Sequence, residues 1–326
     1  MPDMDQVWST YKETLDGVEE QIRKGVDSEV DLINKVAHYI LNSGGKRIRP
    51  LLLIISSHLS GLSNKNQMLV GGGIVEFIHT ATLLHDDVID NAEVRRGIPP
   101  ARRLWGNQAS ILVGDYLYTL AVCQAVKMES FEINYLLSSV CRKMSEGEAL
   151  QLAHNNDFDL TEAVYLQIIE YKTASLLSAS CRLGGIISNA SGEEKEALSR
   201  FGRNLGMAFQ VADDTLDYIA DRRRLGKSLG KDLKEGKVTL PLLHLLQKCT
   251  AAERKQVKKV MLGEKLLQKD LKGVVGLMKK HGSIDYAFQR AHEFIHRAKS
   301  DLSIFKDSVH RQSMLTVADY VIRRDH

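Results

Sequence analysis

The scarcity of proline is the feature that most constrains the fold of this chain. Its 326 residues include five prolines, and none of them lies between Pro100 and Pro241. Because proline breaks helix interiors, this long stretch permits long helices. Apolar residues within it recur at the helical spacings of three and four, as in Leu198, Phe201, Leu205, Ala208, Ala212, Leu216 and Ile219. The sequence shows no convincing alternating strand pattern, so it predicts an all-α fold.

Glycine-rich segments divide the chain into helical stretches. Examples are "SGGKRIRP", "RLGGIISNASGEE" and "LGKSLGKDLKEGK". The segment "DFDLTEAVY" predicts a helix start at which Asp159 is the N-cap and Glu162 completes a capping box. The sequence has no linker-like composition and no clear short repeat. We therefore expect residues 1–326 to form one large helical domain.

Composition excludes several classes of function. With 44% hydrophobic and 26% charged residues, a net charge of +3 and no long basic arm, the chain does not favour a nucleic-acid partner. Its four cysteines have no metal-binding spacing, which indicates free thiols in a reducing cytosol. The N-terminal segment is acidic and polar, and apolar runs such as "LLLII" are too short to span a bilayer. We expect a cytoplasmic protein without a transmembrane segment.

Three aspartates crowd into the segment "TLLHDDVID". Asp86 and Asp90 are four residues apart and share a helix face with His79, while Asp87 lies between them. Like charges at this spacing destabilise a helix by about 0.2–0.5 kcal/mol per pair. A hard cation such as Mg²⁺ would remove this repulsion, because it prefers carboxylate oxygens. A solvated acidic helix end is the alternative that this motif alone leaves open.

The acidic pattern returns in "FQVADDTLDYIAD". Asp213 and Asp217 are again four residues apart, with Asp214 between them. Two acidic turns on two helices could face each other across a cavity and hold several divalent ions. Repetition makes coincidence less plausible, so the sequence predicts a magnesium site.

Basic residues accompany both acidic motifs. Lys46, Arg47 and Arg49 stand beside a helix start that we expect at Pro50, where backbone dipole and side-chain charge favour an anion. Two further arginines follow the first acidic motif. Each basic group alone is more often a solvated surface residue, but their placement beside the acidic motifs favours an anion site.

Two other segments carry positive charge. In "LGKSLGKDLKEGK", glycines alternate with lysines, which is typical either of a lid over a diphosphate or of a plain surface loop. In "IIEYKTASLL", Lys172 and Thr173 interrupt an apolar helix. A lysine there is costly unless it reaches an anion or extends to solvent.

Taken together, these motifs resemble those of the trans-isoprenyl diphosphate synthases. The resemblance runs from Gly44 to Pro241 through GGKRIRP, EFIHTATLLHDDVID, RRG, GD, KTASL, FQVADDTLD and GKVTLP, and it is strongest to the long-chain polyprenyl members. It implies the isoprenoid synthase fold, a single helical bundle around a deep central cavity. It also implies a homodimer that joins isopentenyl diphosphate to an allylic diphosphate.

The resemblance implies roles for individual residues. The ligands of Mg²⁺ would be Asp86, Asp87, Asp90, Asp213, Asp214 and Asp217. Isopentenyl diphosphate would be held by Lys46, Arg49, His79 and Arg96. The allylic diphosphate would contact Arg95, Lys172, Thr173, Gln210, Lys227 and Lys237. The developing carbocation would face the catalytic residues Lys172, Thr173 and Gln210.

Product length is expected to depend on the helix that precedes the first aspartates. In short-chain relatives a bulky aromatic four or five residues before the first aspartate closes the cavity, but here those residues are Thr82 and Ala81. Ile78, deeper along the helix, is only a moderate plug. We therefore expect a long all-trans product of about C40, suited to a quinone side chain.

Several rival functions remain in view. A shorter-chain farnesyl or geranylgeranyl diphosphate synthase is disfavoured by the small residues at positions 81 and 82. A terpene cyclase usually replaces the second aspartate motif with an Asn/Ser/Glu pattern. A non-catalytic subunit of a heteromeric synthase would typically lose aspartates or basic ligands, and this chain keeps them. A purely structural bundle gives no reason for two matched acidic turns.

Overall fold

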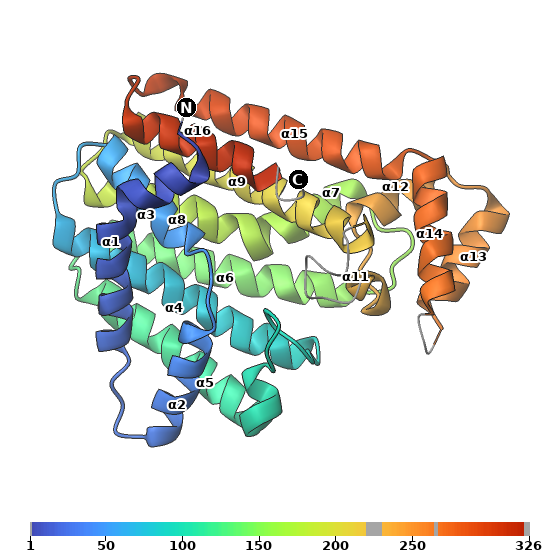
Figure 1. The fold of residues 1–326 in the computed structure, drawn as a ribbon, viewed down its shortest axis with the longest axis horizontal. Helices are drawn as coiled ribbons and strands as arrows, with labels where there is room; N and C mark the ends of the chain where they lie inside the picture. The colour runs from blue at the N-terminus through green and yellow to red at the C-terminus, as the bar shows by residue number, and fades with distance from the viewer. Residues whose placement is uncertain (1, 220–229, 264–266, 323–326) are drawn as a thin grey trace. The chain divides into compact units, whose positions relative to one another are not determined.

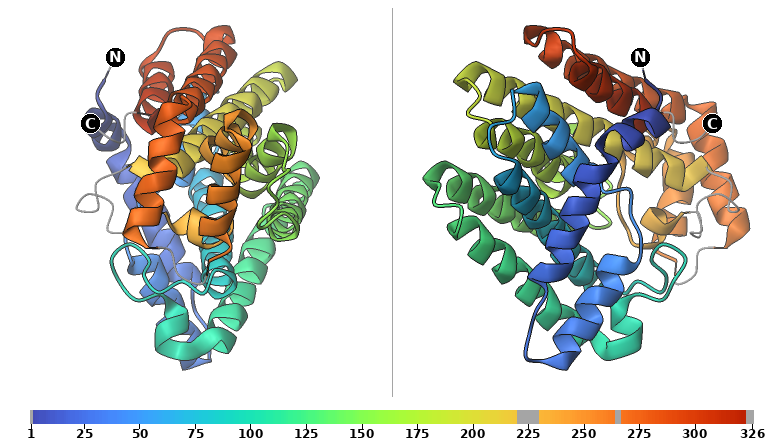
Figure 2. Two further views of the ribbon diagram at one scale, coloured as in Figure 1. Left: turned by 90° about the vertical axis from the view of Figure 1, so that its right-hand side faces the viewer. Right: turned by 60° about the vertical axis from the view of Figure 1, so that its left-hand side comes forward.

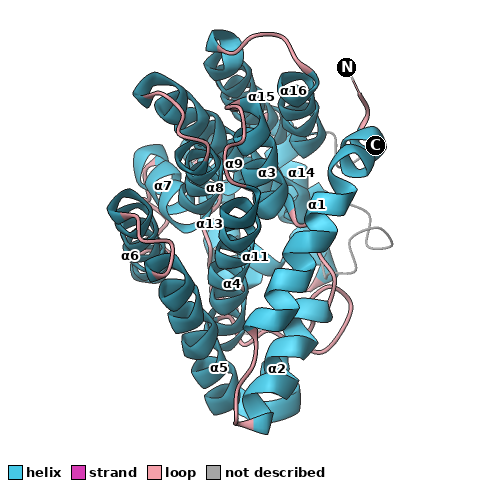
Figure 3. Ribbon diagram, turned by 90° about the vertical axis from the view of Figure 1, so that its left-hand side faces the viewer, coloured by secondary structure: helices cyan, strands magenta, loops and turns pink. Residues whose placement is uncertain are grey.

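The computed structural model describes residues 2–219, 230–263 and 267–322, and helices joined by loops account for this part of the chain (Figure 3). Among the described residues the only extended pairing is an isolated bridge between Arg95 and Ile98. The expected all-α fold is confirmed.

By internal contacts the chain divides into two compact units. The first comprises Met1–Cys141, Leu176–Gly202 and Asp301–Val317, and the second comprises Arg142–Ser175, Arg203–Ser300 and Ala318–His326. Each unit is thus assembled from three separate segments of sequence.

The helices follow one another along the chain with short connections (Figure 1). The first six are α1 (Met4–Gly25), α2 (Asp31–Asn42), α3 (Ile48–Leu59), α4 (Lys65–Ile89), α5 (Ala101–Val126) and α6 (Phe131–Ala153). The next are α7 (Glu162–Ile169), the π-helical turn η1 (Glu170–Ala174), α8 (Ser175–Ile187) and α9 (Gly192–Ile219). The remainder are α11 (Lys231–Lys234), α12 (Leu240–Lys248), α13 (Ala251–Met261), α14 (Gln268–Lys280), α15 (Ser283–Asp301), η2 (Leu302–Ile304) and α16 (Val309–Ile322).

In the first unit, α4 is the central helix and packs against α5, α3 and α1. It buries Phe77 and Ile74 completely, and burial of each such side chain contributes about 1.5–3 kcal/mol. The glycine triplet at 71–73 serves this packing. A β-carbon at Gly72 would lie 2.8 Å from a methyl carbon of Val18 on α1, so only glycine permits this approach of the two helices.

Two helix starts differ from the sequence prediction. Helix α3 begins at Ile48 rather than at Pro50, because Arg47 is its N-cap residue. Pro50 nevertheless lies in the first turn, where its missing amide proton is harmless. The prediction that Asp159 caps α7 is wrong. The hydroxyl of Thr161 accepts the capping hydrogen bond from the backbone of Val164, at 3.3 Å.

Two helices, α4 and α5, are long and apolar enough to cross a membrane by length and composition alone. The sequence prediction of no such segment relied on short apolar runs and did not consider whole helices. This is weak evidence for a span, because core helices pass the same test. In α4, 67% of the apolar window is buried inside the structure, which is typical of a core helix, against 39% in α5.

Candidate active site

The first aspartate cluster occupies the C-terminal end of α4. Asp86 and Asp90 are partly exposed there, whereas Asp87 is completely buried. A carboxylate oxygen of Asp87 accepts a hydrogen bond from Nε of Arg95 at 2.7 Å. The middle aspartate is therefore held inward by a cation from the loop after α4, while the two flanking aspartates remain accessible.

The second cluster lies near the C-terminal end of α9 and again has one buried aspartate between two partly exposed ones. Asp213 and Asp217 are partly exposed, and Asp214 is buried. Its two carboxylate oxygens accept hydrogen bonds from the Tyr165 hydroxyl and from Nε2 of Gln210, both at 2.7 Å. Burial raises the pKa of Asp214 to about 7; the two hydrogen bonds oppose this shift, and the neighbouring aspartates reinforce it.

The position of both clusters is electrostatically unfavourable without a cation. The C-terminal end of a helix carries the negative end of its dipole, where cationic side chains are normally favoured. Neither α4 nor α9 has a basic residue in its last turn. Carboxylate oxygens concentrated at such a point are the donor set that a hard divalent cation prefers, so the residues present fit a magnesium ion.

Asp217 is also tied to the segment that follows α9. Its side chain accepts a hydrogen bond from the backbone amide of Asp232 at 3.0 Å, and its carbonyl accepts one from Gly230 at 2.9 Å. Burial, followed by the negative charges of Asp214 and Asp217, raises the pKa of Asp232 well above its usual value. The start of α11 therefore places another carboxyl group beside the second cluster.

Lys172 and Thr173 lie in the π-helical turn η1 between α7 and α8. Such turns are rare and frequently mark functional sites. The Thr173 hydroxyl donates a hydrogen bond to Oε1 of Gln210 at 2.8 Å. Because Gln210 in turn donates to Asp214, the turn and the second aspartate cluster share one hydrogen-bond network.

Lys172 forms an ion pair with Glu148 of α6, and both side chains are largely buried. Helix α6 can approach this turn closely because residue 147 is glycine. A β-carbon there would lie 2.7 Å from the backbone nitrogen of Lys172. The lysine is thus neutralised within the second unit and held beside the network of Thr173 and Gln210.

The loop "GGKRIRP" is held in place by Arg47. This residue adopts the left-handed conformation, with φ of 43°, which is uncommon outside glycine. Its guanidinium pairs with Glu19 and with the buried Glu76, and donates to the Leu41 carbonyl at 2.7 Å. Burial tends to lower the pKa of Arg47, but the two carboxylates outweigh it and raise that pKa. Arg47 is therefore an anchor for the loop that carries Lys46 and Arg49.

His79 and Arg96 lie near the same loop. Burial, reinforced by Arg49 and Arg96, lowers the pKa of His79 well below its usual value, so its imidazole is neutral. A β-carbon at Gly45 would lie 3.0 Å from Nη1 of Arg96, which places this guanidinium against the loop. Arg49, His79 and Arg96 are thus gathered in the first unit, with Lys46 exposed next to them.

The remaining predicted site residues are the two lysines of the expected lid and three residues of α4. Lys237 pairs with Glu235 at 2.8 Å, whereas Lys227 and much of the expected lid lie outside the described residues. On α4, Ala81 and Ile78 are buried, and the half-buried Thr82 donates its hydroxyl to the His79 carbonyl at 2.7 Å.

The described residues contain no preformed group of three or more His, Cys, Asp or Glu side chains that could hold a metal ion. The first cluster belongs to the first unit and the second cluster to the second unit. Within each, only the first and last aspartates are partly exposed. Binding of a metal would therefore need oxygen ligands beyond one cluster, such as those of a diphosphate.

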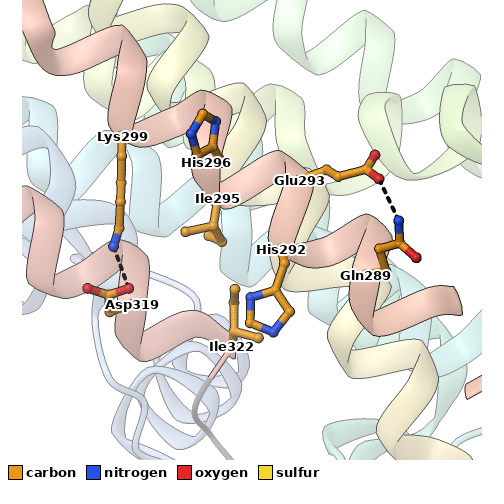
Figure 4. A pocket seen from close by; sticks show the side chains of 8 residues that line it. All are labelled: Gln289, His292, Glu293, Ile295, His296, Lys299, Asp319 and Ile322. Atoms are coloured by element: carbon orange, nitrogen blue, oxygen red, sulfur yellow. Dashed lines mark hydrogen bonds and ion pairs between the residues drawn. The ribbon is translucent and has the colours of Figure 1, made fainter. Parts of the chain in front are cut away.

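A pocket of about 520 Å³ in the second unit lies between α15 and α16 (Figure 4). Its walls include the ion pair of Lys299 and Asp319, at 2.6 Å, and the side chains of His292 and Ile322. No residue predicted from sequence to act in the site lines this pocket. It is therefore separate from the candidate active site.

Sequence reasoning missed the partners that hold the site residues. These are Glu76, Glu148, Tyr165 and Arg47 in its anchoring role. Glu76 stands three residues before His79 and so shares its helix face, a signal that was present in the sequence. Glu148 and Tyr165 gave no comparable local signal, because their partners are distant in sequence.

The fold is all-α, each of two helices ends in an aspartate cluster, and a separate group of arginines surrounds a neutral histidine. Together these features are typical of enzymes that bind diphosphates with divalent cations. The chain belongs to the polyprenyl synthetase family, whose family model matches residues 30–278. It is accordingly an enzyme, a prenyltransferase.

Individual relatives extend the match over nearly the whole chain. Octaprenyl diphosphate synthase of Escherichia coli K12 is 38% identical over 312 residues, which are 95% of each chain. The geranyl-diphosphate-specific all-trans-nonaprenyl-diphosphate synthase of Rhodobacter capsulatus is 36% identical and covers 93% of this chain and 92% of its own. Among solved structures, a Caulobacter crescentus polyprenyl synthase complexed with calcium and isoprenyl diphosphate has a TM-score of 0.94 at 35% identity, covering 99% of this chain and 98% of its own.

Proposed function

We propose that the protein condenses isopentenyl diphosphate head-to-tail onto an allylic diphosphate, repeatedly, to give an all-trans polyprenyl diphosphate of about C40. The observation that carries the proposal is the paired arrangement of carboxylates. Each of two helices ends in partly exposed aspartates four residues apart, with no basic residue in its last turn. A quinone side-chain precursor is the product class that this length suits.

Magnesium is the proposed metal, and the residues that would hold it are Asp86 and Asp90 on α4 with Asp213 and Asp217 on α9. We assign the two buried middle aspartates to support rather than to direct ligation, because their hydrogen bonds point them inward. When bound, the metal supplies charge that makes the allylic diphosphate a better leaving group.

The two substrates would be held by different cationic groups. Lys46, Arg49 and Arg96 would bind isopentenyl diphosphate by charge, and the neutral His79 would add a single hydrogen bond. The allylic diphosphate would meet Arg95, Lys172, Lys227 and Lys237, of which Lys227 lies outside the described residues. Neutral and charged donors together would fix the orientation of each diphosphate.

The chemical step begins when the allylic carbon–oxygen bond breaks and leaves a cation on the hydrocarbon. The oxygens of Thr173 and Gln210, which share a hydrogen bond, supply partial negative charge that stabilises this cation. The isopentenyl double bond then attacks the cationic carbon, and the released diphosphate accepts the proton that the new cation loses. Apolar side chains around the hydrocarbon would exclude water, which would otherwise capture the cation.

Repetition of this step requires room for the growing hydrocarbon. Ala81 is small, Thr82 uses its hydroxyl on its own helix, and Ile78 is only of medium size. These residues would leave room for the hydrocarbon along α4, away from the aspartates. A shorter-chain synthase would need a larger side chain at this depth.

A homodimer is the proposed assembly. Helix α5 and the start of α6 expose large apolar side chains, including Leu112 at 64%, Val126 at 59%, Phe131 at 84% and Tyr135 at 66%. Large exposed apolar side chains concentrated on neighbouring helical segments favour an interaction site, and a second copy of this chain is its proposed occupant. Such burial would also explain why α5 is apolar enough to resemble a membrane span.

We further propose that residues 1–326 form a single polyprenyl diphosphate synthase domain located in the cytoplasm. The interleaving of the two units along the chain supports a single domain, because neither unit is a continuous segment. The four cysteines are free thiols, as expected in a reducing compartment.

The direct test is incubation of the purified protein with isopentenyl diphosphate, farnesyl diphosphate and Mg²⁺, followed by sizing of the dephosphorylated product. We expect elongation to about C40 and complete loss of elongation in EDTA. Products that stop at C20 would favour a shorter-chain synthase. Absence of any elongation would favour a non-catalytic subunit.

A further inference from the structure

The segment that contains α13 and α14 has a larger positive net charge than the whole protein. Residues 248–280 include ten lysines and arginines against three aspartates and glutamates, a net charge of +7. The whole chain has a net charge of only +3, so all other residues together are at −4. The proposed reaction uses none of these basic residues.

Helices α13 and α14, together with Lys248, are here named the basic hairpin, and the two helices pack against each other (Figure 2). Their buried residues are Val257 and Met261 on α13 and Leu271, Val274 and Met278 on α14. The exposed lysines are Lys248, Lys255, Lys259, Lys269, Lys272 and Lys279. Their charge is therefore presented to the surroundings of the protein.

Other basic residues of the hairpin serve its own structure. Arg254 pairs with Asp159 at 2.6 Å, Lys280 pairs with Glu253 at 2.7 Å, and Lys258 lies over the ring of Phe158. Among the described residues, the six exposed lysines make no hydrogen bond or ion pair with another side chain. Their positive charge is left uncompensated within the second unit.

The exposed lysines follow helical spacing and are accompanied by exposed leucines. On α13, Lys255, Lys259 and Leu262 are spaced by four and three residues and so share a face. On α14, Lys269, Lys272 and Lys279 are spaced by three and seven residues and also share a face. Leu262 is 66% exposed at the end of α13, and Leu267 is 48% exposed at the start of α14.

We propose that the basic hairpin is a docking surface for an anionic phospholipid bilayer. Clusters of four to eight basic residues are attracted to anionic headgroups, and neighbouring exposed apolar side chains can enter the headgroup region. The physical need for such a surface rests on the proposed function, since a long polyprenyl chain is expelled from water and must enter a bilayer. The lysines would meet lipid phosphates, and Leu262 and Leu267 would meet the apolar boundary.

Composition favours a bilayer over a nucleic acid as the partner. Residues 248–280 include no aromatic side chain on which bases could stack. Their one arginine, Arg254, is engaged with Asp159 and with backbone carbonyls of the second unit. Lysines act as point charges that suit headgroups at a fluid surface, whereas arginine is the residue preferred for nucleic-acid recognition.

The test is sedimentation of the full-length protein with lipid vesicles, in the absence of substrates. Vesicles of phosphatidylcholine alone are compared with vesicles that also contain phosphatidylglycerol, each at low and at high salt. We expect binding to the anionic vesicles only, and loss of this binding at high salt because the charges are screened.

A matched pair of variants locates the surface. Lys272→Glu combined with Lys279→Glu should lower the partition coefficient on anionic vesicles by at least about tenfold. Lys24→Glu combined with Lys306→Glu makes the same change in net charge at exposed lysines of the first unit and should leave partitioning nearly unchanged. Leu262→Ser should weaken binding and leave its salt dependence in place.

The proposal would be overturned if the unaltered protein bound no vesicles or bound both kinds equally. It would also be overturned if the Lys272 and Lys279 variant bound anionic vesicles as well as the unaltered protein does. Preferential binding of the unaltered protein to duplex DNA over anionic vesicles would be a further contradiction. Elongation in detergent is measured separately on the same preparations. If the unaltered protein elongates but does not bind anionic vesicles, only the docking surface is rejected. If it binds them but does not elongate, only the proposed function is rejected.

Discussion

The two aspartate clusters share one sequence pattern but hold their middle carboxylate in different ways. Asp87 at the end of α4 is buried against a cation, Arg95. Asp214 on α9 is buried against neutral donors, Tyr165 and Gln210, and its pKa is raised to about 7. One cluster thus contains an internally compensated charge, and the other contains a carboxyl group that is costly to ionise. In both, the flanking aspartates are left accessible for a metal.

The largest expected effect comes from removal of a flanking aspartate. Asp86→Asn on α4 or Asp213→Asn on α9 should lower kcat by about 100- to 1,000-fold, because each would remove a direct ligand of the metal. Steady-state elongation at saturating Mg²⁺ provides the measurement. Thermal unfolding without metal should change little, since both side chains are partly exposed.

Replacing the buried middle aspartate should change the free energy of unfolding differently in the two clusters. Asp87→Asn leaves Arg95 without its partner and should lower the free energy of unfolding by about 2–4 kcal/mol. Asp214→Asn can keep both hydrogen bonds and removes a costly buried charge, so stability should change by less than about 1 kcal/mol or rise. Urea unfolding in EDTA measures both. Equal losses in the two variants would show that the clusters are held alike.

A third prediction concerns Arg47, the anchor of the loop "GGKRIRP" in the first unit. Glu76→Gln should raise KM for isopentenyl diphosphate by about tenfold, because Arg47 would no longer hold the loop of Lys46 and Arg49. KM for the allylic substrate should change much less. Glu19→Gln is the matched control, since Glu19 is the more exposed partner of Arg47 and should have a smaller effect. Parallel increases in both KM values would indicate general unfolding instead.

The two helices should also differ in their control of product length. Ala81→Tyr on α4 should shorten the product to about C15–C20 without abolishing turnover, because the ring would block the cavity. Phe209 stands four residues before Asp213 on α9, and Phe209→Leu should leave the length unchanged. Chromatographic sizing of the dephosphorylated products measures the chain length in both variants. A C40 product from the Ala81 variant would contradict the assignment of α4 as the ruler.

Helical spacing was enough to predict the aspartate clusters, the all-α fold and the groups of basic residues, because each depends on local periodicity. Helical spacing could not predict which carboxylate of each cluster is buried, because that depends on tertiary contacts with Arg95 and Tyr165. The same limit explains why local sequence misplaced the starts of α3, which begins at Ile48, and of α7, which begins at Glu162 after the N-cap Thr161. Arg47 was expected beside an anion, yet two distant carboxylates bind it.

The Mg²⁺ dependence of elongation is the most direct test of the claim that the first and last aspartates of each cluster bind the metal. The measurement is the Mg²⁺ concentration that gives half-maximal elongation, in variants of the second cluster. We predict an increase of at least about tenfold for Asp217→Asn and little change for Asp214→Asn. The opposite order, with the larger increase for Asp214→Asn, would contradict the account.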